Sequence, residues 1–263
     1  MASGRWTLIT GASSGIGLEL ARCFAADGDG LVLVARRKDR LETLAAELAH
    51  RHSVPVRVLA TDLEDPAAPQ SLKSVLDAEG ITLHTLVNNA GFGLLGPFAK
   101  LSAERQLAMV QLNVVALTAL SRLFLPGLIE RRQGGILNLS SMAAFQAGPE
   151  MGVYYATKAY GLSLSEALHE EAKSYGVTVT ALCPGPVATE FASVAGMERS
   201  RLFRFVTPMS AAVAARAGFE GYRAGKAIVI PGALNRALMG FSQLTPRVLR
   251  RRASRFMQAA RFP

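Results

Sequence analysis

The stretch from residue 6 to residue 24 constrains the fold more than any other part of the chain. Residues 6–10 form a short apolar run that predicts a buried strand, and residues 18–24 carry apolar side chains at helical spacing. Between them lies a glycine-rich turn, residues 10–17, with the sequence TGASSGIG. A strand, a glycine-rich turn and a helix in this order place a pyrophosphate on the amino terminus of the helix. The stretch therefore predicts an α/β unit that binds a nucleotide.

Each glycine of this turn has its own role in the predicted site. Gly11 permits the tight turn, Gly15 lets the backbone approach the phosphates, and Gly17 lets the helix pack closely on the strand. The serine hydroxyls add hydrogen-bond donors. An ordinary glycine turn is the alternative, but the strand–helix context favours a nucleotide. The residues predicted to contact it here are Gly11, Ser13, Ser14, Gly15, Ile16 and Gly17.

Strands and helices alternate through the rest of the chain. Because the alternation continues without repeats or a linker, we expect a single-domain α/β Rossmann fold. Its doubly wound parallel sheet would have about seven strands, with helices on both faces. The further strands are predicted at 30–35, 54–60, 84–87, 135–139, 177–182 and 227–230, and helices at 39–50, 66–78 and 101–131, the last interrupted near Pro126.

Composition narrows the class of protein further. Half of the residues are apolar, enough for a large core, but no uncharged apolar run is long enough to predict a membrane span. Residues 1–6 lack the layout of a signal peptide. Cys23 and Cys183 are the only cysteines, which predicts no disulfide framework and favours the reducing cytoplasm. The histidines are scattered without the spacing of metal ligands, so no metal site is expected.

The end of the second predicted strand indicates which dinucleotide binds. A cofactor with a free ribose 2′-hydroxyl usually meets an acidic residue there, but Arg36 and Arg37 follow this strand. Two guanidinium groups suit a 2′-phosphate, so we favour NADP(H), with NAD(H) as the alternative. The alternative explanation of the two arginines is that they are only surface charges at the start of the next helix. At the end of the third strand, Asp62 is placed to accept a hydrogen bond from the adenine amino group, with Leu63 beside it.

A tyrosine and a lysine one helical turn apart carry the predicted chemistry. Tyr154 and Lys158 share one face of a predicted helix, which puts the ammonium about 6 Å from the phenol oxygen. At an effective dielectric of about 20, this charge stabilises the phenolate by roughly 3 kcal/mol, or about two pKa units. A tyrosine with a pKa of about 8 can exchange protons at neutral pH. Alone, the pair also fits the surface of an amphipathic helix.

Two further polar residues fit the same site. Ser141 follows the fifth predicted strand, and a strand end in an open α/β sheet faces the ligand crevice. Its hydroxyl can hydrogen-bond a substrate carbonyl, although a serine at this place is often only a turn residue. Asn113 lies in an apolar helical stretch, where a buried amide must find partners. A purely structural asparagine would give the same pattern.

The segment 190–207 follows an irregular stretch after the sixth strand. Its apolar side chains, in weakly patterned sequence, predict a lid over an apolar ligand. A helix that packs on a neighbouring subunit is the alternative. The apolar residues are Phe191, Val194, Met197, Leu202, Phe203, Phe205 and Val206.

Together these stretches resemble the short-chain dehydrogenase/reductase family over residues 5 to about 232. Within the family, the chain resembles the broad bacterial group of NADP-dependent reductases. One position departs from the pattern, because many NADP-binding members carry a basic residue where this chain has Ser14. The matching elements are Thr10-Gly11-x-x-x-Gly15-x-Gly17, Asp62, Asn88-Asn89-Ala90-Gly91, Asn113, Ser141, Tyr154-x-x-x-Lys158 and Pro184-Gly185 with Thr189.

The resemblance implies a role for each matching residue. Tyr154 would be the general acid that protonates a carbonyl oxygen as hydride arrives, and Lys158 would lower its pKa and bind the nicotinamide ribose. Ser141 would orient the carbonyl. Asn113 would support, through a helix kink and a water, a proton relay behind Lys158. The residues implied to hold the cofactor are Asn89, Ala90, Gly91, Tyr154, Lys158, Pro184, Gly185, Val187 and Thr189.

The favoured function is that of an NADP(H)-dependent oxidoreductase, which interconverts a ketone or aldehyde and the corresponding alcohol. The substrate is expected to be rather apolar. A 3-oxoacyl thioester reductase is an alternative with the same chemistry. A regulatory protein that senses NADP without turnover is an alternative from another class, but a sensor has no need of all four residues predicted to be catalytic. We expect a homodimer or homotetramer in the cytoplasm. No nucleic-acid partner is expected, because residues 1–190 are slightly acidic.

Residues 233–263 form a basic extension of the same domain, beyond a core that is complete at about residue 232. The extension carries seven arginines and no acidic residue, with large apolar side chains between them. Pro246 can start a helix within it. Three interpretations stay open: packing on a neighbouring subunit, binding of an anionic substrate or carrier, and peripheral contact with an anionic membrane.

Overall fold

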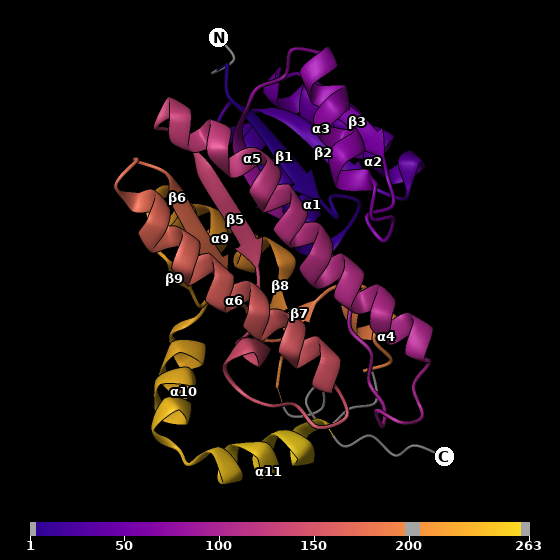
Figure 1. Ribbon diagram of the computed structural model, residues 1–263, viewed down its shortest axis with the longest axis vertical. Helices are drawn as coiled ribbons and strands as arrows, with labels where there is room; N and C mark the ends of the chain where they lie inside the picture. Colours follow the sequence, from indigo (N-terminus) through magenta and orange to yellow (C-terminus); the bar gives the residue numbers. More distant parts are fainter. Residues whose placement is uncertain (1–3, 198–205, 259–263) are drawn as a thin grey trace.

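The computed structural model describes residues 4–197 and 206–258, in which seven parallel strands form the central sheet (Figure 1). Their order is β3-β2-β1-β4-β5-β6-β9, so the chain reverses direction across the sheet between β1 and β4. This arrangement confirms the predicted doubly wound Rossmann fold. The strands are β1 (Trp6–Thr10), β2 (Gly30–Ala35), β3 (Val56–Ala60), β4 (Leu83–Asn88), β5 (Gly135–Leu139), β6 (Thr178–Leu182) and β9 (Ile228–Val229), and β7 (Val187–Ala188) pairs separately with β8 (Met209–Ser210).

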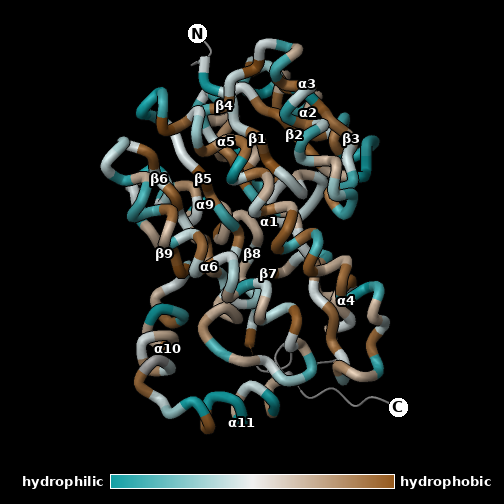
Figure 2. The backbone as a smooth tube through the Cα atoms, viewed as in Figure 1, coloured by the Kyte–Doolittle hydropathy of each residue, from teal (hydrophilic) through white to brown (hydrophobic). Residues whose placement is uncertain are grey.

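Helices cover both faces of the sheet because successive side chains of each strand point to opposite faces. Ile9 and Leu33 belong to the core cluster on one face, and Leu8 and Val32 to the cluster on the other. β2 is therefore apolar along nearly its whole length and buried throughout, and such apolar stretches are brown in Figure 2. The first face is covered by α1 (Gly15–Ala26), α2 (Lys38–His52) and α9 (Ala211–Arg223), and the second by α3 (Ala68–Ala78), α5 (Leu117–Arg131) and α6 (Gly152–Lys173).

The long helical region is irregular at a different place from the one predicted. α4 (Ala103–Val110) passes into a π-helical stretch, η1 (Gln111–Ala116), and then into α5, which continues through Pro126. The predicted interruption near Pro126 is therefore wrong. A proline removes one backbone hydrogen bond from a helix, and the burial of Phe124 and Leu128 on either side holds the helix against the core.

One run among the described helices, Ala103–Arg131, is long and apolar enough to cross a membrane by length and composition, although no such span was predicted. Of its most apolar 18-residue window, 39% is buried within the protein. Leu117, Leu120 and Leu128 are buried in the core beneath the sheet. A core helix of an α/β protein has the same apolar character as a span.

A buried polar ladder crosses the sheet just below the carboxyl ends of its strands. The amide nitrogen of Asn88 donates to Ser121 Oγ at 3.1 Å and to Asn138 Oδ1 at 2.9 Å. The amide nitrogen of Asn138 in turn donates to Ser165 Oγ at 2.9 Å. The ladder ties α5 to α6 through β4 and β5, directly beneath the predicted site. The sequence did not indicate these contacts.

Two helices follow the sheet: α10 (Ala233–Leu244) and α11 (Arg247–Gln258). They extend past the carboxyl ends of the strands, at the opposite end of the molecule from the amino terminus (Figure 1). α11 begins directly after Pro246, as predicted, and Figure 2 shows that it is largely hydrophilic. Arg250 anchors it, because its Nη1 donates to the carbonyl of Phe145 at 3.2 Å.

Candidate active site

Tyr154 lies in the first turn of α6, and Lys158 follows one turn later on the same face. Both side chains are buried, and Nζ of Lys158 lies 5.8 Å from the centre of the Tyr154 ring. The same Nζ donates to the carbonyl of Leu139 at 2.8 Å, and Ser140 Oγ donates to the Lys158 carbonyl at 2.9 Å. These bonds fix α6 on the end of β5, so the predicted tyrosine–lysine pair meets the carboxyl edge of the sheet.

Burial controls the ionisation of this pair. Desolvation raises the pKa of Tyr154 well above its ordinary range, and a hydrogen bond with the Ser141 side chain opposes that rise only in part. Desolvation also lowers the pKa of Lys158 to about 8. The predicted lowering of the tyrosine pKa is therefore wrong, because desolvation of the buried phenol outweighs the effects that oppose it. Tyr154 is a neutral phenol at neutral pH.

Ser141 lies between β5 and α6 and caps a short 3-10 helix, η2 (Met142–Phe145). Its Oγ accepts a hydrogen bond from the backbone N–H of Ala143 at 3.1 Å, so the hydroxyl is held in place and keeps its own proton to donate. The Ser141 side chain also lies close enough to the Tyr154 phenol to lower its pKa in part. Two hydroxyls that lie so close together can converge on a single ligand oxygen.

Asn113 connects the loop after β4 to α6. Its Nδ2 donates to the Phe92 carbonyl at 2.9 Å and to Thr157 Oγ1 at 3.1 Å, and its Oδ1 accepts from the Phe92 N–H at 3.2 Å. Gly91 completes the packing, since a Cβ there would lie 2.8 Å from Asn113 Oδ1. The chain is π-helical around Asn113, in η1, at the place where the family resemblance implied a helix kink.

The glycine-rich turn forms a cradle at the amino terminus of α1. Gly11 and Gly15 have φ of +66° and +58°, a region that favours glycine. A Cβ on Gly17 would collide with the Asn89 amide and the Gly11 carbonyl. Asn89 itself donates from Nδ2 to the carbonyls of Thr10 and Gly11, at 2.8 and 3.2 Å, and so supports the turn from below. The cradle fits a pyrophosphate, with Gly15 and Ile16 opening the helix.

The two arginines after β2 have different surroundings. Arg37 donates from Nη2 to Ser14 Oγ at 2.8 Å and from Nε and Nη2 to Ser13 Oγ at 3.2 and 3.1 Å. Arg36 instead lies 3.1 Å from Glu64 and 3.8 Å from Asp62. Arg37 therefore contacts the glycine-rich turn, whereas Arg36 lies beside the acids after β3; that both arginines meet one phosphate stays a prediction.

The acidic residues at the end of β3 lie on the surface. Asp62 is half exposed, and its Oδ1 accepts from the Glu64 N–H at 3.0 Å. Leu63 is buried in the core, so it can meet a ligand only through its backbone. Within residues 4–197 and 206–258, no three His, Cys, Asp or Glu side chains gather closely enough to hold a metal ion.

The segment after β6 lies over the glycine-rich cradle. A Cβ on Gly15 would be 3.0 Å from Thr189 Cγ2, while Gly185 faces the Asn235 side chain. The Pro184 carbonyl accepts from the Met142 N–H at 3.0 Å, which joins this segment to η2, and Val187 is buried. The predicted residues of the segment thus line the space between the cradle and Ser141.

Only part of the predicted lid belongs to the described chain. Phe191 begins α7 (Phe191–Val194), and its ring lies 5.3 Å from the Tyr154 ring. Met197 is buried in the same cluster as Tyr154. The start of the lid therefore covers the tyrosine. Leu202, Phe203 and Phe205 lie outside the described residues.

The site and sheet define a dinucleotide-binding Rossmann protein with a Ser–Tyr–Lys centre. In a comparison with models of known protein families, the short chain dehydrogenase model matches residues 5–199. That range contains the glycine cradle and all four residues predicted to be catalytic. The chain belongs to the short-chain dehydrogenase family.

The chain is similar to a curated reductase and to two dehydrogenases of known structure. The very-long-chain 3-oxoacyl-CoA reductase of Bos taurus is 33% identical over 195 residues, which are 73% of this chain but only 62% of the relative. A short-chain dehydrogenase from Sphingobium yanoikuyae in complex with NADPH is 33% identical, with a TM-score of 0.81 and coverage of 92% of this chain and 97% of that one. A family member from Burkholderia phymatum in complex with NAD is 25% identical, with a TM-score of 0.82 and coverage of 94% and 97%.

Proposed function

We propose that this protein is an NADP(H)-dependent oxidoreductase that interconverts a carbonyl group and an alcohol. The observation that carries the proposal is the meeting of Ser141, Tyr154 and Lys158 beside the glycine cradle, in a buried site. A bound nicotinamide would supply or accept the hydride. The cradle and the segment that holds Thr189 would bind the dinucleotide on the side of the site that faces α1.

The residues of the chain account for the proton transfer. Tyr154 holds its proton at neutral pH because burial raises its pKa, so it can donate that proton to a carbonyl oxygen as negative charge develops there. Ser141 donates a second hydrogen bond to the same oxygen and so stabilises the charge. Lys158, held by the Leu139 carbonyl, places a positive charge behind the phenol once protonated.

A screen tests the activity directly. Purified protein is mixed with NADPH and a panel of ketones, aldehydes and 3-oxoacyl thioesters, and loss of the reduced nicotinamide absorbance is followed. Turnover of at least one carbonyl class is expected. Failure of the whole panel, together with retained NADPH binding, would instead favour the non-catalytic sensor of the cofactor.

The preference for NADP(H) over NAD(H) rests on Arg37. Its guanidinium lies against the hydroxyls of Ser13 and Ser14, at the mouth of the glycine cradle. This set of donors suits a 2′-phosphate. The NADPH complex of the Sphingobium yanoikuyae relative supports the preference, and the NAD complex of the Burkholderia phymatum relative keeps NAD(H) as the alternative.

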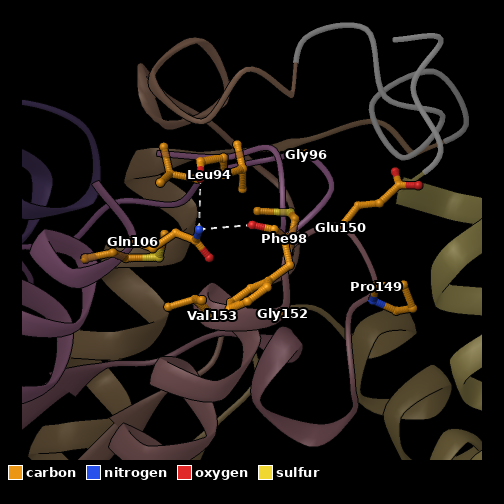
Figure 3. A pocket seen from close by; sticks show the side chains of 11 residues that line it. Leu94, Gly96, Phe98, Gln106, Pro149, Glu150, Gly152 and Val153 are labelled. Carbon is orange, nitrogen blue, oxygen red and sulfur yellow. Dashed lines mark hydrogen bonds between the residues drawn. The ribbon is translucent and has the colours of Figure 1, made fainter. Parts of the chain in front are cut away.

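The substrate would be apolar beyond its carbonyl group. A cavity of about 300 Å³ opens beside the first turn of α6, and apolar side chains form most of its wall (Figure 3). Gln106 is a polar exception: its nitrogen donates to the carbonyls of Phe98 and Leu101, and its buried oxygen has no partner. Met151 lines the cavity and belongs to the same apolar cluster as Tyr154, although Tyr154 and Ser141 do not themselves line the cavity.

This cavity favours a mid-sized apolar ketone or aldehyde as substrate. A 3-oxoacyl thioester is the second candidate, because the Bos taurus relative is a very-long-chain 3-oxoacyl-CoA reductase and the carboxyl-terminal arginines offer charge to an anionic carrier. The ratio of kcat/KM for matched substrates separates the two. A 3-oxoacyl thioester that exceeds the plain ketone of equal chain length would support the second candidate.

We place the protein in the cytoplasm as a homo-oligomer. Both cysteines are free thiols, which agrees with a reducing compartment. Four large apolar side chains of α10 are exposed at helical spacing, and a neighbouring subunit is the partner that we favour for them, with an anionic membrane as the alternative. They are Leu234, Leu238, Phe241 and Leu244.

A further inference from the structure

An acidic side chain lies where two arginines converge beside the glycine cradle. Glu190 Oε2 accepts from Arg37 Nη1 at 2.7 Å, and Oε1 accepts from Arg40 Nη1 at 2.5 Å. The other nitrogens of Arg37 donate to the hydroxyls of Ser13 and Ser14. A carboxylate is thus held by two guanidinium groups next to two hydroxyls. The same set of donors binds a phosphate monoester.

Glu190 is a permanent anion at this place. Hydrogen bonds from Arg40 and then Arg37 lower the pKa of Glu190 to about 2, so the carboxylate stays charged at any physiological pH. The side chains remain 39–46% exposed, however. Ion pairs this exposed contribute little to stability and exchange readily with solvent ions. A stronger anion can therefore displace the carboxylate from the two guanidinium groups.

We propose that the carboxylate of Glu190 competes with the cofactor 2′-phosphate for Arg37 and Arg40. When NADP(H) binds, its 2′-phosphate displaces this carboxylate from both arginines. The inference rests on the proposed preference for NADP(H) and adds two residues to its specificity, Arg40 and Glu190. A phosphate dianion carries more charge and more acceptor oxygens than a carboxylate. It therefore competes well for the guanidinium pair. NAD(H) has no such phosphate and leaves the pairs with Glu190 intact.

Because of its position in the chain, displacement of Glu190 would also affect the surroundings of Tyr154. Glu190 immediately precedes α7, whose first residue, Phe191, packs on the ring of Tyr154. Thr189, on the other side, lies over Gly15 of the cradle. Release of Glu190 would remove the ion pairs that tie this start of the lid to α2. Binding at the adenosine end and access to Tyr154 would then be coupled through one short segment.

Fragments of the cofactor test the competition without any turnover. Binding of 2′,5′-ADP, which carries the 2′-phosphate, and of 5′-AMP, which lacks it, is measured by calorimetry for the wild type and for Glu190→Gln. Glu190→Gln is expected to tighten 2′,5′-ADP about tenfold or more while 5′-AMP stays within about twofold. Glu190→Ala should behave in the same way, because the effect comes from loss of the negative charge.

Glu42→Gln is the matched control. It removes the same charge from α2, where Glu42 pairs with Lys38 at 3.6 Å; within the described part of the chain, Glu42 forms no ion pair or hydrogen bond with Arg37 or Arg40. Both ligands should bind this variant as they bind the wild type. Thermal unfolding of each variant shows that it is folded before binding is compared.

Three results would overturn the inference. Unchanged binding of 2′,5′-ADP to Glu190→Gln would show that Glu190 does not compete. Weaker binding of both fragments would show that the ion pairs clasp the ligand rather than oppose it. Equal binding of both fragments to the wild type would overturn the cofactor preference as well. In the first two cases, a wild type that prefers 2′,5′-ADP leaves the proposed NADP(H) specificity standing.

Discussion

The Nη2 of Arg37 lies 2.8 Å from the hydroxyl oxygen of Ser14, although 23 positions separate the two residues. Many NADP-binding relatives in the resembled family carry a basic residue at the position of Ser14. Here the positive charge arrives at that position from the end of β2 instead. Arg37 thus brings a positive charge to a position where the motif itself supplies none.

This contact predicts unequal roles for the two arginines. Arg37→Ala should weaken NADPH binding by roughly 2–3 kcal/mol, because it removes charge-assisted hydrogen bonds to the 2′-phosphate. Arg36→Ala should cost less than about 1 kcal/mol, since Arg36 is exposed and paired with Glu64. Fluorescence titrations with NADPH and NADH measure both effects. Equal losses for the two cofactors would show that Arg37 does not contact the 2′-phosphate.

Removal of the phenol hydroxyl should abolish turnover. Tyr154→Phe is expected to lower kcat by about 100-fold or more, the range of general acid–base catalysis, while NADPH binding changes only a few-fold. Tyr155→Phe is the control, because the adjacent residue points to another face of α6. Steady-state rates and cofactor titrations on both variants decide the matter. A Tyr154→Phe enzyme with more than about a tenth of the wild-type rate would contradict the assignment.

The lowered pKa of Lys158 predicts a pH dependence of stability. Between about pH 8 and about pH 10, the unfolded lysine binds a proton that the folded lysine does not. The contribution of Lys158 to the free energy of unfolding therefore rises with pH across this window. Urea denaturation of the wild type and Lys158→Met should diverge by roughly 2–3 kcal/mol in favour of the wild type as the pH increases. Parallel curves would mean that the lysine keeps its ordinary pKa.

The contacts of Asn113 predict that its replacement destabilises the protein more than replacement of Thr157 does. Asn113→Ala removes both partners of the Phe92 backbone and the donor to Thr157 Oγ1, which keeps its own bond to the Tyr154 carbonyl, so it should lower the free energy of unfolding by roughly 2–4 kcal/mol. Thr157→Val keeps both bonds between Asn113 and Phe92 and should cost about 1 kcal/mol. Chemical denaturation ranks the two. If the Thr157 variant is the less stable, the loop after β4 does not depend on Asn113.

The exposed face of α10 predicts a change in assembly. The double variant Phe241→Ser with Leu244→Ser should reduce the oligomeric state without loss of NADPH binding, because these side chains are far more exposed than core residues. Light scattering after size exclusion measures the mass. Co-sedimentation with anionic vesicles, at low and high salt, tests the membrane alternative. An unchanged mass and unchanged sedimentation would exclude both roles for this face.

The sequence alone determined the architecture and the placement of the Tyr154–Lys158 pair on one face of a helix. Strand and helix positions follow from local periodicity, and all seven strands of the sheet lie where apolar runs predicted them. The glycine cradle follows from a backbone conformation that favours glycine. The spacing of Tyr154 and Lys158 follows from the helical repeat. Each of these features depends on residues close together in the chain, so it is visible in a single stretch of sequence.

Tertiary structure decided what depends on distant parts of the chain. The pKa of Tyr154 rises rather than falls, because desolvation is a sum over every element packed around the ring. The separation of Arg36 from Arg37, and the contact of Arg37 with Glu190 across 153 positions, depend on how β2, α1 and the segment after β6 meet. Neither the burial of a tyrosine nor a long-range ion pair has a local signature in sequence, since both arise only when the sheet brings its strand ends to one edge.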